Sequence, residues 1–382
     1  MEFEEYEFKI ITPIFSYGNN EIPEIRPASI KGMMRYMFRI AQPTLKTSDL
    51  LKHENKLFGD AESKASPIRL AIVSKPKADT DDSQFLHHKD SKTGEFRKKF
   101  KSVAFSQGQN FTVRMMLRPK HLRDLEYLNN LKEKQYECLS VEEQKDFDRL
   151  NIEIKDACWY KSLLELSFLF IGIGQRSRKG RGRAGNEKKK LKDIKGTKDD
   201  ILILLNEISG ELYQFDDKDE KIIPCKSKKL DRPVINEIKF GKVIEKQGNN
   251  EPWQVLLEKI DEASHCIKNR DNQVPEYASL VEKRTNRNGK NYHETYYATG
   301  SITEPWCRNK RKRECKNRCI CDYRTVSRFS SSIIVGAVET TDGLLPVYTC
   351  VTAIVKGKLL DAEEEWKKFI DFAEEMEVDR RG

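Results

Sequence analysis

The chain has 382 residues, enough for two or three domains with sizeable cores, and its 70 Lys and Arg residues exceed its 61 Asp and Glu residues by nine. Basic residues gather at 176–192 and 308–318 and acidic ones at 361–378, which predicts local patches for a nucleic acid or another acidic surface. An acidic start and the lack of a long apolar run favour a cytoplasmic protein with no signal peptide or membrane partner, and the odd number of cysteines, nine, argues against a disulfide framework.

The first elements are a strand over 6–13 and a helix that begins at Pro27. The helix has an apolar face, expected to join a core, and a basic stripe beside it in which Lys31, Arg35 and Arg39 recur every four residues. Gly32 lies within this stripe and would let a phosphate backbone approach closely. The stripe is therefore either a solvated face or a nucleic-acid contact.

Further strands are expected over 66–73 and 111–117, with an exposed polar loop over 76–101 between them. The range 121–156 is heavily charged and has leucines at helical intervals, which predicts a helical insertion. The apolar residues of 158–171 share one helical face, which predicts a buried helix.

A glycine-rich basic loop, 172–183, follows that helix directly. Gly172, Gly174, Gly180 and Gly182 form two Gly-x-Gly pairs, with five basic residues and no acidic one among or just beyond them. Glycine brings backbone N–H groups close to a ligand, and the arginine fork matches phosphate oxygens. The spacing fits neither a P-loop nor a dinucleotide-binding fingerprint. The alternatives are a clasp for a polyanion, extended by Lys188, Lys189, Lys190 and Lys192, or a disordered basic loop.

The rest of the chain predicts a second unit of the same kind. A helical stripe over 201–215 ends the first domain (1–215), a polar segment with two prolines (216–232) is the expected linker, and a second domain spans 233–382. In that domain we expect, in order, a strand over 234–244, a helix over 253–267, strands over 332–338 and 345–355, and an amphipathic helix over 366–376. This order predicts α+β units with antiparallel sheets.

Four cysteines gather within fifteen residues: Cys307, Cys315, Cys319 and Cys321. Four thiolates complete a tetrahedral, structural zinc site, although the spacing lacks the usual Cys-x2-Cys pairs. The alternatives are bound zinc, with His265, Cys266 or His293 able to replace one ligand, and free thiols. Seven basic residues between Arg308 and Arg318 make the same segment a second expected RNA contact.

Several of these motifs together resemble the CRISPR-associated RAMP superfamily, and most of all the first subunit of the type III-B Cmr effector complex. They are Ile25-Arg26-Pro27-Ala28-Ser29-Ile30-Lys31-Gly32, the following Met34–Arg39, Leu57-Phe58-Gly59, Ser66-Pro67-Ile68 and the glycine-rich loop. The resemblance is strong over 5–185 and faint afterwards, because Ser331 stands where the family has a proline in its later Arg-x-Ser-Pro element.

The resemblance implies two ferredoxin-like, RRM-type domains with insertions, in a subunit that binds RNA and assembles with other RAMP subunits but is not the nuclease. The implied partners are a guide RNA and a target RNA in antiviral defence, with no cofactor other than the zinc considered above. The expected RNA-binding residues are Arg26, Ser29, Lys31, Gly32, Arg35, Arg39, Gly172, Gly174, Gln175, Arg176, Ser177, Arg178, Lys179, Gly180, Arg181, Gly182, Arg183, Arg311, Arg313 and Arg328.

Two other functions stay open at this point. A metal-independent RAMP endoribonuclease that processes guide RNA would need a base and a cation near a ribose 2′-OH, and His53 with Tyr36 and Lys31 is the nearest such set. A free-standing zinc-ribbon-like protein on ribosomal or other RNA is the third hypothesis.

Overall fold

The computed structural model describes residues 3–19, 22–60, 62, 65–81, 102–226, 230–246, 248–267, 280–285, 291–297, 301–303, 331–355 and 358–375. The elements of the first half are β1 (Phe3–Ile10), α1 (Pro27–Ile40), α2 (Thr47–Phe58), β2 (Ile68–Ser74), β3 (Ala78–Asp81), β4 (Ser102–Phe105), β5 (Asn110–Leu117), α3 (Pro119–Lys132), η2 (Tyr136–Cys138), α4 (Val141–Glu153), α5 (Ala157–Leu166), the π-helical turn η3 (Ser167–Ile171), β6 (Ala184–Asn186) and α6 (Ile194–Ser209).

The second half begins with a hairpin and continues through an α+β unit. Its elements are β7 (Tyr213–Asp216), β8 (Lys221–Pro224), β9 (Ile235–Phe240), α7 (Pro252–Cys266), β10 (Leu280–Thr285), β11 (Asn291–Tyr297), β12 (Ser301–Thr303), β13 (Ile333–Thr340), β14 (Gly343–Val351), β15 (Ala353–Val355), β16 (Lys358–Leu360) and α9 (Glu363–Glu375).

The first sheet has the ferredoxin-like order. Its strands lie in the order β2-β5-β1-β6, all neighbours are antiparallel, and the chain runs β1-α1-β2-β5-α5-β6 with α2, the β3–β4 hairpin and the α3–α4 pair as insertions. Alternate residues of β5 are buried, and Phe8 and Phe111 pack on Phe168 of η3. The expected ferredoxin-like fold of the first half is confirmed.

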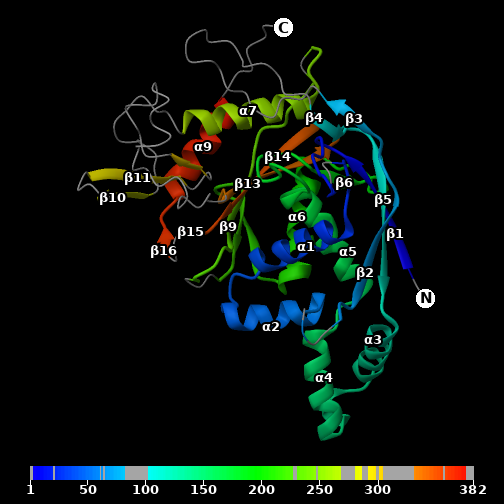
Figure 1. Ribbon diagram of the computed structural model, residues 1–382. Helices are drawn as coiled ribbons and strands as arrows, with labels where there is room; N and C mark the ends of the chain where they lie inside the picture. Colours follow the sequence, from blue (N-terminus) through cyan, green and yellow to red (C-terminus); the bar gives the residue numbers. More distant parts are fainter. Residues whose placement is uncertain are drawn as a thin grey trace, which may run out of the picture.

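The second sheet has the order β13-β14-β9-β8-β7, again antiparallel throughout. The sequence of β9, α7, β13, β14 and α9 is that of a ferredoxin-like unit up to its second helix, and β8 occupies the place beside β9 where a fourth strand would lie. The helices α7 and α9 cover one face of this sheet together (Figure 1).

The sequence predicts a linker over 216–232, but this range contains β8 and so contributes a strand to the second sheet. The expected helical stripe over 201–215 is also wrong at its end, because α6 stops at Ser209 with Gly210 in the left-handed conformation and Phe215 belongs to β7. The physical reason is the short hairpin, whose two strands have four residues each and give no extended alternation.

The two halves share one core. Ile235, Ile238, Ile334 and Val347 of the second sheet belong to the cluster that includes β1, α1 and α5, while Ile333 and Val335 face α7 and α9. The second sheet is therefore covered on both faces. The α3–α4 pair, which confirms the expected helical insertion, lies at the opposite end of the view from α7 and α9 (Figure 1).

Candidate nucleic-acid interface

The glycine-rich loop folds back on itself beside the segment that follows β1. Ile173 N–H donates to Gly182 O at 3.0 Å, and Gly182 N–H donates to Pro13 O at 3.0 Å. Gly172 has φ +67°, and a Cβ on it would lie 2.8 Å from Gly182 O and 2.9 Å from Arg181 O. Only glycine fits there, because the position combines a left-handed backbone with a close approach of two chain segments.

Two of the loop's arginines point into the protein. Arg183 is 0% exposed, and its guanidinium donates to Val335 O (from Nε, 3.0 Å) and to Ser177 O (from Nη2, 2.6 Å). Arg181 is 2% exposed, and its Nη2 lies 2.8 Å from Oδ2 of Asp261 on α7. The expectation that these two arginines bind RNA phosphate is corrected, because buried guanidinium groups engaged by protein oxygens have no exposed side to offer a ligand.

The outer part of the loop, 174–179, lies between α1 and the second half. Gly174 and Gln175 are exposed, and Arg176 to Lys179 are half-buried. The guanidinium of Arg178 stacks over the Tyr36 ring of α1 at 4.7 Å and donates to Ser331 O at 2.6 Å. Lys179 Nζ lies 4.9 Å from the centre of the Phe369 ring. Of the predicted loop residues, the structure thus leaves 174–178 at the surface.

The basic stripe of α1 lies at the surface as expected, but two of its arginines are held by a buried carboxylate. Arg35 and Arg39 both donate to Glu54 of α2, which is 1% exposed, while the Arg39 side chain remains 47% exposed. The hydrogen bond from Arg39 to Glu54 raises the pKa of the Arg39 guanidinium. Glu54 therefore fixes the direction of two cations without covering them.

The remaining α1 positions are open at this surface. Arg26 caps the N-terminus of α1 with no side-chain cap hydrogen bond and is exposed, as is Gly32, where an added Cβ meets no atom within 4 Å. Ser29 is half-buried. We call the set Arg26, Lys31, Gly32, Arg35, Arg39 and Arg178 the α1 basic face.

One basic residue next to this face was missed from the sequence. Arg118 is the residue before α3, and its backbone N–H donates to Pro67 O at 2.9 Å. Lys31 Nζ donates to Ser66 Oγ at 2.8 Å and to Ile68 O at 3.1 Å. The signal available in the sequence was the Arg-Pro pair, since Arg118-Pro119 repeats the Arg26-Pro27 helix start.

The catalytic set considered from the sequence is not brought together. Tyr36 packs under Arg178, and Lys31 bonds to Ser66. Burial lowers the pKa of His53, and the charged groups that act on it belong to α2 and to the end of α4 and the residues just after it. His53, Tyr36 and Lys31 therefore have separate surroundings.

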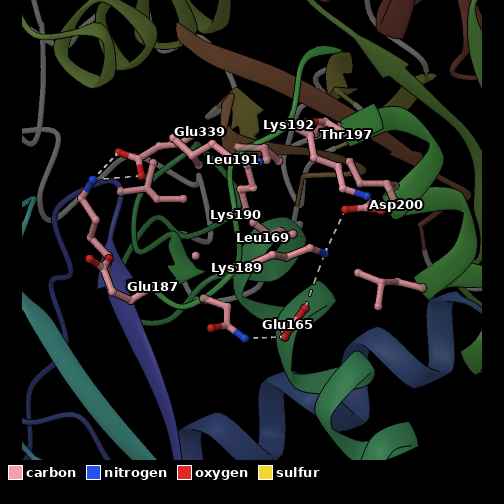
Figure 2. A pocket seen from close by; sticks show the side chains of 17 residues that line it. Glu165, Leu169, Glu187, Lys189, Lys190, Leu191, Lys192, Thr197, Asp200 and Glu339 are labelled. Carbon is pink, nitrogen blue, oxygen red and sulfur yellow. Dashed lines mark hydrogen bonds and ion pairs between the residues drawn. The ribbon is translucent and has the colours of Figure 1, made fainter. Parts of the chain in front are cut away.

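Three of the lysines after the loop, Lys189, Lys190 and Lys192, line a pocket of about 200 Å³ between β6, α6 and the end of β13 (Figure 2). Lys189 Nζ lies 3.3 Å from Asp200 and 3.8 Å from Glu165, and Lys192 Nζ lies 2.6 Å from Asp200. Acidic side chains pair with Lys189 and Lys192, so positive and negative charges nearly cancel in the pocket. The sequence predicts that the lysines extend the basic surface of the loop, and this pairing argues against that.

The remaining expected site residues fall on parts of the chain that the structure does not describe. Arg311, Arg313, Arg328 and the four cysteines Cys307, Cys315, Cys319 and Cys321 lie outside the described residues. So do the side chains of His265, Cys266 and His293, although their backbones belong to α7 and β11. Within the described part of the chain, no helix is long and apolar enough to cross a membrane.

Comparison with solved structures finds similar chains. One is a chain of the cryo-EM structure of Cmr-beta bound to cognate target RNA and AMPPnP with ssDNA present (12% identity, 97% of this chain and 98% of that chain, TM-score 0.49). Another is Cmr1 from Pyrococcus furiosus in its apo form (16% identity, 97% and 96%, TM-score 0.46). These TM-scores are too low to establish a shared fold, and no curated protein matches the chain.

A family model matches part of the chain. The model of the RAMP superfamily matches residues 7–184, slightly less than half of the chain. This segment contains α1, β2, β5 and the whole glycine-rich loop, together with the end of β1 and the first residue of β6. These elements carry the sequence motifs. Residues 7–184 are therefore the part of the chain that is similar to the RAMP superfamily.

Proposed function

We propose that this protein is a non-catalytic RNA-binding and assembly subunit of a type III-B CRISPR effector, the Cmr ribonucleoprotein. In that role it contacts guide or target RNA at one end of the complex, beside other RAMP subunits, in antiviral defence in the cytoplasm. The RAMP match over 7–184 and the motifs at Arg26–Gly32 and Gly172–Gly182 support this proposal.

The α1 basic face is the observation that carries RNA binding. It joins cations from two parts of the family pattern, since Arg178 of the glycine-rich loop stacks on Tyr36 of α1. The guanidinium groups of Arg35 and Arg39 are oriented by Glu54, and their forks suit phosphate oxygens. Gly32 leaves room for a polynucleotide backbone to cross the helix.

The two buried arginines of the loop give it a structural role in addition to RNA contact. Arg181 and Arg183 tie the loop to α7 and β13 of the second half. The same loop therefore holds the two halves together and presents its outer residues beside α1. We assign RNA contact to 174–178 and cohesion to Arg181 and Arg183.

RNA binding is tested by replacing Arg26 and Arg39 together with alanine and measuring the anisotropy of labelled single-stranded RNA at several salt concentrations. Loss of two phosphate contacts should lower affinity by about 25-fold at about 0.1 M salt and reduce the slope of log K against log salt by about 1.4. Arg35 remains to pair with Glu54, so the fold should persist.

The matched control replaces Arg123 and Arg149, two exposed arginines of α3 and α4, with the same change of net charge. It should bind RNA like the wild type. Equal losses in both double variants would show a general charge effect and contradict a specific role for the α1 basic face. RNA sequence should matter little, because base pairing supplies specificity in a guided complex.

The endoribonuclease is the alternative to this proposal. The same labelled RNA tests this alternative. If the wild type shortens the RNA and His53→Ala does not, the protein is an endoribonuclease and not a non-catalytic subunit. The zinc site at Cys307, Cys315, Cys319 and Cys321 stays a prediction.

A further inference from the structure

We propose that Arg118 and Lys31 bind one phosphate group of an RNA strand that crosses α1 at Gly32. This inference rests on the proposed function and extends the α1 basic face to a residue outside the family motifs. The ligand group is a phosphodiester, whose charge a guanidinium and an ammonium can share.

Both cations meet at one short segment, 66–68, although they come from different elements. Lys31 reaches it from α1 and bonds to Ser66 Oγ and Ile68 O. Arg118 reaches it from the end of β5, since its N–H bonds to Pro67 O and the neighbouring Leu117 pairs with Ile68. The segment thus brings the two residues into one neighbourhood, and the Arg118 charge lies near enough to contribute to the lowered pKa of Lys31.

No carboxylate offsets these two charges among the described residues. The acceptors of Lys31 are a hydroxyl and a carbonyl, and the Arg118 Nε is buried with no hydrogen-bond partner in that part of the chain. Burial and then the nearby Arg35 and Arg118 lower the pKa of Lys31. By contrast, Arg35 and Arg39 share Glu54. Two adjacent cations without a counterion repel each other, and a bound phosphate relieves that repulsion.

The start of α3 adds to the same positive field. This helix of fourteen residues has Arg118 at its N-cap position, no side-chain cap and no acidic residue in its first turn. Helix N-termini carry partial positive charge, which acidic residues normally offset. The access to the site is free on the α1 side, where Gly32 is exposed and an added Cβ meets nothing within 4 Å.

The test replaces Arg118 with alanine in the full-length protein and repeats the RNA titration over salt. Loss of one phosphate contact should reduce the slope of log K against log salt by about 0.7, which is about fivefold in affinity at about 0.1 M salt. Arg118→Lys should recover part of the affinity, because it restores the charge without the fork. If the alanine variant does not fold, Arg118→Gln takes its place. It removes the same positive charge but keeps a polar side chain of similar reach, so the same decrease in slope is expected.

Arg123→Ala is the matched control, since it removes an exposed arginine from the same helix. It should leave the slope unchanged. If Arg118→Ala and Arg118→Gln bind RNA like the wild type while the Arg26 and Arg39 double variant is weakened, the inference is overturned and the proposed function stands. If the wild type itself shows no salt-dependent affinity for RNA, the proposed function fails and this site with it.

Discussion

Arg183 is a cation enclosed by the protein backbone, and its neighbour Gly172 makes that enclosure possible. A Cβ at Gly172 would collide with the Arg183 guanidinium and with the carbonyl oxygens of Arg181 and Gly182. The glycines of the loop therefore serve chain packing at least as much as ligand approach. Burial lowers the pKa of Arg183, so its charge depends on the carbonyl acceptors that surround it.

Gly172→Val should destabilise the protein by about 3 kcal/mol, because it forces a β-branched residue to φ +67° and opens the contact with the opposite side of the loop. Urea denaturation followed by circular dichroism measures the loss. Gly32→Ala is the contrasting variant, with a helical position and free space, and should raise stability by about 0.5 kcal/mol. Equal stability of Gly172→Val and wild type would refute the packing role.

For single residues, the sequence could identify the chemical group that a side chain carries, but not whether that side chain points to the surface or into the protein. Glycines and arginines in a Gly-x-Gly pattern look the same whether the guanidinium points to RNA or to Val335. The α1 positions were easier, because helical periodicity separates the apolar face from Lys31, Arg35 and Arg39. The partner of those arginines, Glu54, lies on another helix and has no local signal in the sequence.

Among the elements, the α3–α4 pair depends on a buried histidine. His121 of α3 is 6% exposed, its Nε2 lies 2.7 Å from Lys155 O beyond α4, and the Tyr160 ring of α5 packs against it. Burial lowers the pKa of His121 below 6.5, and the nearby Asp124 and the Lys155 carbonyl only partly oppose this effect. The histidine is therefore held in its neutral form.

The unfolded chain, where His121 has its ordinary pKa near 6.5, takes up the proton more readily than the folded one. Stability should thus fall as the pH drops below about 6.5. His121→Gln keeps a donor for Lys155 O and should show a smaller fall between about pH 7.5 and about pH 5.5 in urea denaturation. Burial also lowers the pKa of His53, so His53→Gln should reduce the fall too, but by less, because that side chain is more exposed than His121. An unchanged pH dependence in His121→Gln would contradict the assignment.

Long elements could be predicted from their periodicity, as α1, α7 and β5 show. The short ones could not, because β6 has three residues and the strands of the β7–β8 hairpin have four. Their position is set by pairing with β1 and β9, which are distant in the chain. Tertiary pairing of this kind leaves little trace in local composition.

Across the whole molecule, the glycine-rich loop joins the two halves through a buried ion pair. Replacing Arg181 with methionine should cost about 3 kcal/mol of unfolding free energy, because it removes the guanidinium that bonds to Asp261, whose side chain is 12% exposed. Adding Asp261→Leu should restore part of this loss, since two apolar side chains fill the same contact without an isolated charge. Chemical denaturation measures the unfolding free energy of both variants. A double variant that is less stable than the single variant would contradict the proposed contribution of the ion pair.

The β7–β8 hairpin also determines where the polypeptide can be divided. A fragment that starts at residue 233 would lack the strand beside β9 and expose a row of N–H and C=O groups, which invites self-association. A fragment that starts near residue 211 keeps the hairpin but still bares the face of the second sheet that packs on η3. Neither piece should remain monodisperse when expressed alone, so the two halves are best produced as one polypeptide.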